Sequence, residues 1–380
     1  MHEVYINKTS FFLPNDPVEN DDMESYLGLI DGIPSKSKSI VLSQNGIKKR
    51  YYAITKEGKS THSNAELTSL AVRGLFKSNS NNLATVDFMA CGTSSPDLLI
   101  PSHGVMVHGL LKEIGPIEVV TSSGNCCSGI HAFKHAYQAI RLGEAQYSVS
   151  TGSERASLTL HSKMFKEEID KLHQLISDPI IGFEKDFLRW MLSDGAAAFL
   201  MTPKKNTNEI SLRVEWVENI SFANEADTCM YSGGVKLESG EMKSYQDFSN
   251  KEIIENSILS LKQDVKILRK NIVKYGGIAL VKTLKKRNIT PEQIDYFLPH
   301  FSSLYFKEPI IKELKSLNIE IPKEKWFYNL TNVGNVGSAS AYLMLDELFR
   351  SGRLKTGEKI MILVPESARF SYSIVWLTVC

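Results

Sequence analysis

The segment GNCCSGIHAFKHAYQAI, residues 124–140, aligns without a gap with NVGNVGSASAYLMLDEL, residues 332–348. In each segment a glycine-containing turn leads into a stretch with the apolar period of an α-helix. Gly143 is expected to end the first of these helices. A repeated unit of this kind indicates an internal duplication, and the rest of the chain is interpreted from it.

The offset of 208 residues extends to the strands around these helices. Before them, VDFMACGTSS at 86–95 aligns with IDYFLPHFSS at 294–303, and both are typical of a buried strand that runs into a turn. After them, with a shift of six residues, GEAQYSVSTGSER from Gly143 resembles GEKIMILVPESAR from Gly357. Each copy predicts strand, helix and strand, so the chain is expected to form an α/β fold with a largely parallel sheet and a pseudo-twofold axis.

The two halves are expected to meet near Asn206, after the closing strand DGAAAFLMTPK, which gives halves at 1–205 and 206–380. Two segments fall outside the repeat. The first, at about 155–191, contains the amphipathic stretch KMFKEEIDKLHQLI, and the second, at about 222–250, is irregular and rich in Gly, Ser, Glu and Met. We expect both to be insertions that cover a site.

The charges of the 380 residues nearly balance, with 44 Lys and Arg against 43 Asp and Glu and a formal net charge of +1. This balance gives no electrostatic reason to expect nucleic acid or an anionic membrane as the main partner. No apolar run reaches 18 residues and no signal peptide is evident, so a soluble cytoplasmic protein without a membrane span is expected. The five cysteines have no metal-ligand spacing and no nucleotide motif occurs, so neither metal nor cofactor is expected.

Equivalent positions of the two copies carry different functional groups. Cys127 aligns with Asn335, and Gly92 aligns with His300. A twofold axis would bring the two helix starts face to face, so Cys127, His300 and Asn335 are expected to converge at the sheet edge where α/β folds bind ligands. A helix N-terminus favours the cysteine thiolate, a histidine can act as base or donor, and an asparagine amide is a neutral donor. Such a group suits acyl transfer from a thioester.

Each of these residues also has an ordinary structural interpretation. A free cysteine is commonly a small buried apolar residue, and an asparagine between glycines often occupies a turn. His300, after a proline, could equally be a satisfied turn histidine. Their relation through the repeat favours the functional interpretation. Cys126 is the competing nucleophile, and we expect it to pack into the adjacent core.

Three motifs resemble those of the thiolase superfamily, specifically the β-ketoacyl-acyl-carrier-protein synthase III-like enzymes. CSG at Cys127, LPH at His300 and NVGNVGSAS around Asn335 correspond to the C-[AS]-G, PH and GN-x-[GS]-x-x-S motifs of that family. The similarity extends from GIKKRYYA at Gly46 through SDGAAAFL at Ser193 to the C-terminal strand. It implies a thiolase-like five-layered α-β-α-β-α fold, a homodimer, and acyl thioester substrates carried on acyl carrier protein or coenzyme A.

The resemblance also implies a role for each residue. Cys127 would take the acyl group. His300 and Asn335 would then bind the thioester carbonyl of the extender and stabilise the carbanion that attacks the acyl-enzyme in a Claisen condensation. The backbone N–H of Cys127 would form half of the oxyanion hole. The family's glycine-rich C-terminal loop corresponds to ESARFSY here, so Ser367 or Ala368 would donate the second N–H.

Some residues depart from the family pattern. Housekeeping relatives hold the coenzyme A adenine with a tryptophan and an arginine, whereas this chain has Ile40 and Gln44, which argues against an acetyl-CoA-primed starter enzyme. ESARFSY also places bulk and charge near the site. NDDMESYLGLIDG followed by GIKKRYYA resembles the ketosynthases that build dialkylresorcinols in flexirubin-type pigment clusters. Those enzymes join two fatty acyl-derived thioesters, one of which carries a 3-oxo group.

Other functions remain open. An acyltransferase or thioesterase with the same three residues would form no carbon–carbon bond. A noncatalytic ketosynthase partner subunit would normally lack the nucleophile that Cys127 supplies. A metabolic thiolase needs a second cysteine near the C-terminus, but Cys380 is the last residue. The basic cluster Lys48, Lys49 and Arg50 is either a docking site for an acidic carrier protein or a solvated face.

Overall fold

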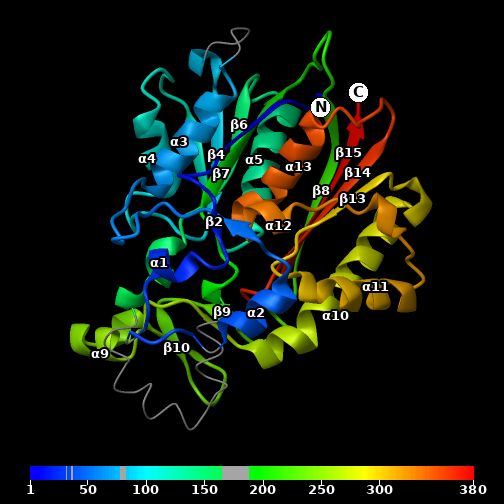
Figure 1. Ribbon diagram of the computed structural model, residues 1–380. Coiled ribbons are helices and arrows are strands. Elements are labelled where there is room, and N and C mark those ends of the chain that lie inside the picture. Colours follow the sequence, from blue (N-terminus) through cyan, green and yellow to red (C-terminus); the bar gives the residue numbers. More distant parts are fainter. Residues whose placement is uncertain (31, 36, 78–82, 165–187) are drawn as a thin grey trace.

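The centre of the molecule is one mixed sheet of nine strands, in the order β13-β14-β15-β8-β1-β7-β6-β4-β5 (Figure 1). The computed structural model describes residues 1–30, 32–35, 37–77, 83–164 and 188–380. The N-terminal wing of the sheet contains β1 (Tyr5–Phe12), β4 (Phe88–Thr93), β5 (Glu118–Ser123), β6 (Ser148–Glu154) and β7 (Gly195–Thr202). The C-terminal wing contains β8 (Leu212–Ser221), β13 (Tyr296–Pro299), β14 (Lys359–Glu366) and β15 (Ser371–Val379).

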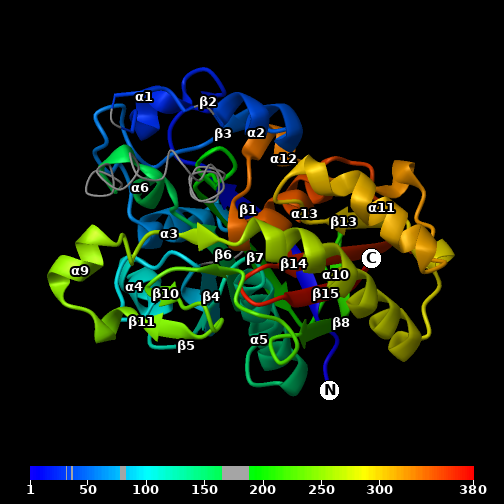
Figure 2. The same ribbon diagram turned by 90° about the horizontal axis from the view of Figure 1, so that it is seen from below.

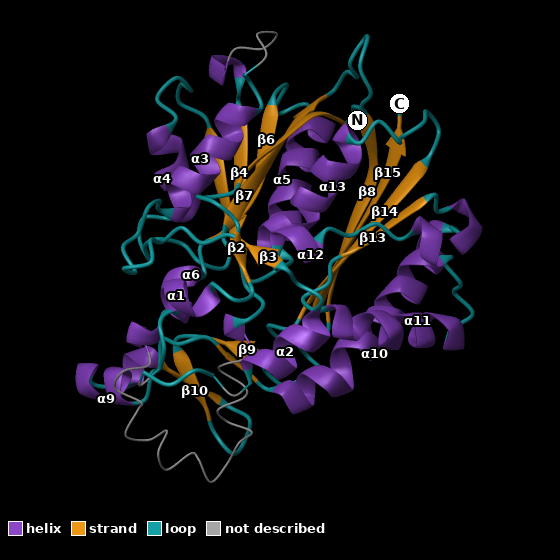
Figure 3. Cartoon of the chain, viewed as in Figure 1, coloured by secondary structure: helices purple, strands orange, loops and turns teal. Residues whose placement is uncertain are grey.

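The two wings face each other across a pair of central helices, which gives the thiolase-like five layers of helix, sheet, helix, sheet and helix (Figures 1 and 3). The central layer is formed by α5 (Ser128–Leu142) and α13 (Ser340–Arg350). The outer layer on the N-terminal wing is formed by α3 (Asn64–Gly74) and α4 (His103–Leu110), and that on the C-terminal wing by α10 (Val265–Arg287) and α11 (Lys307–Ser316). The prediction of a five-layered α/β fold is confirmed.

The two central helices form because their apolar residues repeat at helical spacing on the faces that meet the sheet. On α5 the residues Ile130, Phe133, Tyr137 and Ile140 are all buried. Gly143 ends this helix with a left-handed φ of 83°, as the sequence predicts. The short helical turn Gly337–Ala339 precedes α13 at the equivalent position of the second copy.

The prediction of a largely parallel sheet is wrong. Only the pairs β4–β5, β4–β6 and β13–β14 are parallel, whereas β1–β7, β6–β7, β1–β8, β8–β15 and β14–β15 are antiparallel. The cause is the closing strand of each half. After the strand-helix-strand unit, β7 and β15 each return alongside β6 and β14 in the opposite direction.

The structure also corrects the register of the repeat after the helices. Phe88 on β4 pairs with Ser148 on β6, and the equivalent Tyr296 on β13 pairs with Ile360 on β14. The second copy is therefore four residues longer at this point, not six. In the corrected alignment Glu154, the last residue of β6, is equivalent to Glu366, the last residue of β14.

The two halves approach most closely where each helix begins. A Cβ added to Gly129 on α5 would lie 2.2 Å from the backbone oxygen of Ser338, and one added to Gly152 on β6 would lie 2.3 Å from the same atom. Real Cβ atoms do not approach an oxygen so closely, so both positions require glycine. In this contact the segment before α13 packs directly against the start of α5.

The remaining elements gather at the end of the sheet where β4, β6, β13 and β14 terminate (lower part of Figure 1, seen from below in Figure 2). Most of the predicted insertion at 155–191 lies outside the described residues, since 165–187 are not among them. The segment 222–250 is less irregular than predicted, because it contains three short strands. No helix in the described ranges is both long and apolar enough to cross a bilayer. The short elements are β2 (Val18–Glu19), α1 (Met23–Leu27), α2 (Lys38–Asn45), β3 (Lys49–Arg50), α6 (Ser157–Leu160), β9 (Met230–Tyr231), β10 (Gly234–Lys236), β11 (Met242–Ser244), α9 (Asn250–Glu255), β12 (Lys262–Gln263) and α12 (Leu330–Val333).

Candidate active site

A cavity of about 490 Å³ lies where the ends of the strands from both wings meet. His300 and Asn335 from the C-terminal half line it together with Cys126 and Glu154 from the N-terminal half. The two segments that we expected to cover a site, at 155–191 and 222–250, contribute Leu158, Leu188 and Met230 among others to its wall. Much of the wall is apolar and is formed by Leu99, Leu158, Leu188, Met191, Leu192, Met230, Leu259, Leu261, Leu268 and Ile272.

His300 lies one residue after β13, and the parallel pairing with β14 fixes its backbone. Its N–H donates to the carbonyl of Leu363 at 2.8 Å. The side chain is 3% exposed, and Nε2 has no hydrogen-bond partner within the described residues. Burial lowers the pKa of His300 to about 4, so the imidazole is neutral at pH 7. A buried, neutral and unpartnered ring nitrogen at a cavity wall is suited to a hydrogen bond with a bound substrate.

Asn335 is held by both halves of the chain. Its backbone N–H donates to the carbonyl of Met191 at 3.0 Å, and its own carbonyl accepts from the N–H of Ser193 at 2.9 Å. The side-chain Oδ1 accepts from the N–H of Gly337 at 3.0 Å. Because Oδ1 is engaged in this way, the Nδ2 group is the part of the amide left to donate to a ligand. His300 and Asn335 thus line the same cavity, whereas Cys127 is not among its lining residues.

The two adjacent cysteines are exposed in the reverse of the expected order. Cys127 caps the N-terminus of α5, but its side chain is 0% exposed, and Sγ lies 3.3 Å from the carbonyl oxygen of Val364 and 3.6 Å from that of Ser371. Cys126 is half-buried and lines the cavity. Cys126 packs against the adjacent core as predicted, and it also lines the cavity. The difference arises because Cys127 directs its thiol beneath the β14–β15 turn.

The thiol of Cys127 is in its neutral form. Burial raises its pKa well above the ordinary value, and the Glu366 carboxylate adds to this shift. A helix N-terminus favours the thiolate and so acts against this shift. The thiolate that the helix dipole predicts therefore needs a base, or a change in the surroundings of the sulfur, before it can attack a thioester.

The predicted oxyanion donor of Cys127 is already engaged. Its backbone N–H donates to Oε2 of Glu366 at 2.9 Å, and the N–H of Asn125 donates to the same oxygen at 3.0 Å. The N–H that the resemblance assigns to the oxyanion hole is therefore occupied in this structure, because the last residue of β14 reaches across to the start of α5. A substrate oxygen can bind this N–H only after the carboxylate moves.

The predicted second half of the oxyanion hole lies in the β14–β15 turn. Ser367 and Ala368 both line the cavity. The hydroxyl of Ser367 accepts from Gln263 Nε2 at 2.9 Å. Arg369 and Phe370 follow with φ of 83° and 58°, left-handed values that glycine adopts far more easily than other residues.

The bulk and charge of this turn do not all reach the site. The Arg369 side chain donates to the carbonyl of Ala226 at 3.0 Å, and Phe370 is buried beside Phe222, Tyr275 and Tyr372. These contacts hold the left-handed residues in place. The other charged residue, Glu366, bonds the start of α5 and is not among the residues that line the cavity.

Two buried glutamates were missed by the sequence reasoning. Glu154 accepts from the N–H of Ser94 at 3.1 Å, the hydroxyls of Ser94 and Ser95 at 2.7 Å each, and the N–H of Ser338 at 3.1 Å. Glu366 bonds the start of α5 in the same way that Glu154 bonds the turn before α13. The signal was present in the sequence, because aligning the second strands with a shift of four would have placed the two glutamates on each other.

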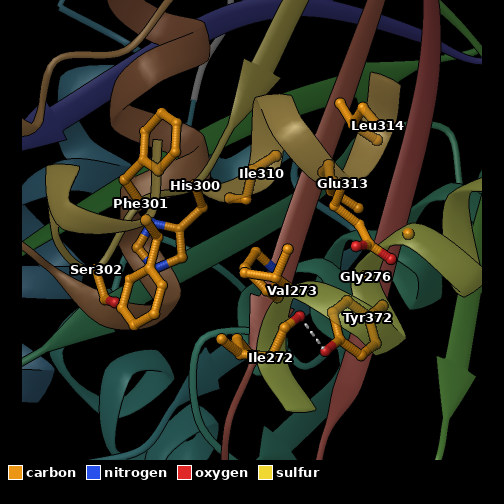
Figure 4. A pocket seen from close by; sticks show the side chains of 14 residues that line it. Ile272, Val273, Gly276, His300, Phe301, Ser302, Ile310, Glu313, Leu314 and Tyr372 are labelled. Atoms are coloured by element: carbon orange, nitrogen blue, oxygen red, sulfur yellow. Dashed lines mark hydrogen bonds between the residues drawn. The ribbon is translucent and has the colours of Figure 1, made fainter. Parts of the chain in front are cut away.

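A second, smaller cavity of about 40 Å³ lies behind His300, between α10, α11 and the sheet (Figure 4). It shares Ile272, His300, Ser302 and Pro365 with the larger cavity. Figure 4 shows His300 on one side of it and Leu314 on the opposite side. The hydroxyl of Tyr372 donates to the carbonyl of Ile272 at 2.7 Å, so its ring contributes an apolar surface to the wall. Most of the lining is apolar, with Glu313 and Ser302 as polar members, so a hydrocarbon chain is compatible with it.

The basic cluster near the N-terminus does not form one surface. Arg50 is 0% exposed and donates to Asn20, Lys48 and Trp190. Only Lys48 and Lys49 remain at least partly exposed. The prediction that all three residues form a docking patch or solvated face is therefore wrong, because Arg50 bonds the interior.

Comparison with known proteins agrees with this fold. The family described as "3-Oxoacyl-[acyl-carrier-protein (ACP)] synthase III C terminal" matches residues 284–365, which include His300 and Asn335 but not Cys127. A β-ketoacyl-[acyl-carrier-protein] synthase III from Clostridium perfringens is 25% identical over 353 residues, which cover 92% of each chain.

Two solved structures share the fold over nearly the whole chain. The tetronic acid condensing enzyme AbyA1 has a TM-score of 0.77 at 16% identity and is covered to 99%, as is this chain. Xanthomonas campestris OleA with bound lauric acid and lauroyl-CoA has a TM-score of 0.72 at 17% identity, with 99% of both chains covered. The chain thus has the thiolase-like fold. Its sequence is similar to β-ketoacyl-[acyl-carrier-protein] synthase III over nearly its whole length, in agreement with the resemblance seen in the motifs.

Proposed function

We propose that this protein is a condensing enzyme that transfers an acyl group from a thioester to Cys127 and then forms a carbon–carbon bond. The observation that carries the proposal is the pair of donors at the cavity wall, namely the unpartnered Nε2 of His300 and the Nδ2 of Asn335. Two neutral donors that converge on one oxygen stabilise the enolate of a second thioester. No bound cofactor or metal is needed for this chemistry.

The proposed reaction has two stages. First, the Cys127 thiol loses its proton, the thiolate attacks the acyl thioester, and the carrier thiol leaves with a proton. Second, the extender forms a carbanion at its α-carbon, by loss of CO₂ from a malonyl thioester or of a proton from a 3-oxoacyl thioester. This carbon attacks the acyl carbonyl, the bond to the Cys127 sulfur breaks, and the released thiolate takes up a proton. For the first stage Cys127 must turn from Val364 and Ser371 towards the cavity, and the Glu366 carboxylate must leave its N–H.

We further propose fatty acyl substrates and a role in dialkylresorcinol or flexirubin-type pigment formation. The apolar wall of the larger cavity supports an alkyl chain, and so does the smaller cavity behind His300. OleA, which shares the fold, has been crystallised with lauric acid and lauroyl-CoA. The exposed Ile40 in place of an adenine-stacking tryptophan argues against acetyl-CoA as the primer.

The expected partners are an acyl carrier protein and a second copy of the chain in the cytoplasm. Strand β5 lies at the edge of the sheet and is partly exposed along its length, so its outer edge is available for pairing. Beside it, Leu99 is 81% exposed and Ile100 is 88% exposed, although Leu99 also lines the cavity. A partner that covers these residues would bury apolar surface and complete the cavity wall.

One observation favours a second candidate function. The buried Sγ of Cys127 and its engaged N–H are compatible with a noncatalytic partner subunit, or with an acyltransferase that uses Cys126. The two candidates differ from the condensing enzyme in their products, because neither forms a carbon–carbon bond.

Mass spectrometry of the products tests the proposal. Purified protein is incubated with dodecanoyl-CoA and, in separate reactions, with a malonyl or a 3-oxododecanoyl thioester. A condensing enzyme gives products that contain both carbon chains, and His300→Ala or Asn335→Ala lowers their yield while acyl loading persists. Free dodecanoic acid alone, or no reaction with any pair, would overturn the proposal.

A further inference from the structure

The turn between β14 and β15 presents two free backbone donors beside the cavity. Ser367 and Ala368 both line the cavity, and neither N–H makes a hydrogen bond to any residue that the structure describes. At the other end of the turn, the carbonyl oxygen of Ser371 lies 3.6 Å from Sγ of Cys127. The turn is therefore next to both the nucleophile and the cavity. Its N–H groups can stabilise an oxyanion only if the turn keeps one fixed conformation.

The turn does not hold this conformation by itself. Arg369 and Phe370 have φ of 83° and 58°, and ESARFSY contains no glycine that would adopt such values easily. Residues with left-handed φ persist only where the surrounding structure fixes them, and they gather at functional sites. Contacts from another part of the chain must therefore hold the turn.

These contacts come from residues 222–263, which we call the brace segment. The segment includes β9, β10 and β11 and lies at the strand ends in the lower part of the molecule (Figure 1). The N–H of Phe222 donates to the carbonyl of Phe370 at 3.0 Å, and Nε of Arg369 donates to the carbonyl of Ala226 at 3.0 Å. The brace segment thus contacts both left-handed residues.

The last residue of the brace segment, Gln263, reaches the part of the turn that faces the cavity. It is 5% exposed and lines the cavity, and its Nε2 donates to Oγ of Ser367 at 2.9 Å. Its backbone is fixed on both sides, because β12 pairs Gln263 with Met230 on β9 and the next residue, Asp264, caps the 23-residue helix α10. Ser367 is therefore held by a side chain with an anchored backbone.

Met230 connects the same pair of strands to the start of α5. The hydroxyl of Ser367 donates to Sδ of Met230 at 3.6 Å, and Nδ2 of Asn125 donates to the same sulfur. Asn125 lies two residues before Cys127, whose N–H is the other expected oxyanion donor. The pair β9–β12 thus contacts both segments that contain the oxyanion donors.

We propose that Gln263 is a positioning residue for acyl transfer, which holds the N–H groups of the β14–β15 turn in place through the hydroxyl of Ser367. The inference rests on the proposed function, because it assumes that Cys127 takes an acyl group. An oxyanion forms when the Cys127 thiolate attacks the acyl thioester, and again when the extender attacks the acyl-enzyme. A displaced donor therefore slows both stages.

The test is a double-mutant cycle on the loading step. Gln263→Leu removes the donor, whereas Ser367→Ala removes the hydroxyl and retains the backbone N–H. Dodecanoyl loading from dodecanoyl-CoA is followed by intact-protein mass in single turnovers. We expect each variant to lower the maximal loading rate by about 10-fold or more, with the half-saturating concentration within about twofold of wild type. The double variant should be no slower than the slower single variant, since both remove the same bond.

Two comparisons separate this role from others. His300→Ala, whose proposed role is confined to the second stage, should load at the wild-type rate, whereas Gln263→Leu should slow both loading and malonyl condensation. Gln246→Leu, the same exchange at an exposed position of the brace segment, should leave both rates unchanged. Chemical denaturation measures the stability of each variant. Should Gln263→Leu fail to fold, Ser367→Ala still tests the bond from the other side.

The possible outcomes distinguish the inference from the proposed function. Unchanged loading in the single variants, or losses that multiply in the double variant, would overturn the role of Gln263 and leave the condensing function intact. A raised half-saturating concentration at an unchanged maximal rate would also overturn it, because Gln263 would then be a substrate contact. Wild-type protein that loads but condenses no extender would overturn the proposed carbon–carbon bond formation alone, and wild-type protein that takes no acyl group would overturn both.

Discussion

Burial, not a neighbouring charge, sets the protonation state of His300. Its ring lies behind the strand end of β13, and the loss of water around it lowers its pKa to about 4. The neutral ring can donate one hydrogen bond to a thioester oxygen without placing a positive charge in the site. The side chain can form a hydrogen bond with substrate, because its Nε2 has no partner among the described residues.

The first prediction concerns the acid side of the pH profile. Since the pKa of His300 is lowered to about 4, malonyl condensation should show no loss from imidazole protonation until the pH approaches that value. The measurement is the rate of malonyl condensation between pH 4 and pH 8. A histidine-dependent limb near the ordinary value of 6.5, absent in His300→Asn, would show that the ring is solvated.

The same shift affects folding. Between pH 6.5 and about 4 the unfolded chain binds a proton at His300 that the folded chain does not, so the free energy of unfolding falls as the pH falls through this window. His103, whose pKa burial also lowers to about 4, acts in the same direction.

At the scale of elements, the site depends on how closely the starts of α5 and α13 approach each other. Gly129 on α5 faces the backbone oxygen of Ser338, and this contact has no side chain that could move aside. A helix glycine is therefore required here for packing, although alanine is ordinarily the better helix former.

We expect Gly129→Ala to destabilise the protein by roughly 1–3 kcal/mol or more, because a Cβ at 2.2 Å from Ser338 forces the two helices apart. The matched control is Gly109→Ala on α4, where nothing lies within 4 Å of an added Cβ. Chemical denaturation measures both. Equal stability of the two variants would contradict the close approach.

The third prediction concerns the apolar wall that α10 contributes. Ile272 lines both cavities, so Ile272→Trp should reduce the space for an alkyl chain. We expect kcat/KM for dodecanoyl thioester to fall by about 10-fold or more, with a smaller effect for butanoyl thioester. Ile278→Trp on the same helix is the control, because Ile278 is 39% exposed. An identical loss for both chain lengths would show that Ile272 does not determine the preference for acyl chain length.

Some of these helices and strands could be predicted from the sequence alone, and others could not. The repeat predicted β4, the helix α5 and its end at Gly143, because these depend on local apolar spacing and on one left-handed residue. It did not predict the register of β14 or the antiparallel direction of β7 and β15, since strand pairing depends on contacts between distant segments.

The same distinction applies to the site. His300 and Asn335 were found because the repeat places them at a strand end and before a helix. The direction of the Cys127 side chain and the reach of Glu366 were not found. Both depend on the turn between β14 and β15, whose left-handed Arg369 and Phe370 have no signature in the sequence.

At the scale of the whole molecule, the exposed apolar residues before α4 lie next to the sheet edge formed by β5 and contribute Leu99 to the cavity. A second copy that pairs along this edge would cover residues that a monomer leaves in water. The proposed homodimer is therefore tied to the completeness of the cavity, not only to stability.

We expect the wild type to have twice the mass of the 42.6 kDa chain in light scattering, and the double variant Leu99→Asp, Ile100→Asp to have the mass of one chain. Charges buried at this edge would disfavour association. Leu142→Asp, which alters another exposed leucine at the end of α5, should leave the mass unchanged. A wild-type monomer would contradict the dimer.

The most direct test of the central claim is to locate the acyl group on the protein. Wild-type protein is treated with dodecanoyl-CoA, digested, and sequenced by tandem mass spectrometry across Asn125–Gly129. The account predicts that the added mass lies on Cys127, persists in Cys126→Ala and disappears in Cys127→Ala. An acyl group on Cys126, which already faces the cavity, would contradict the assignment of the nucleophile.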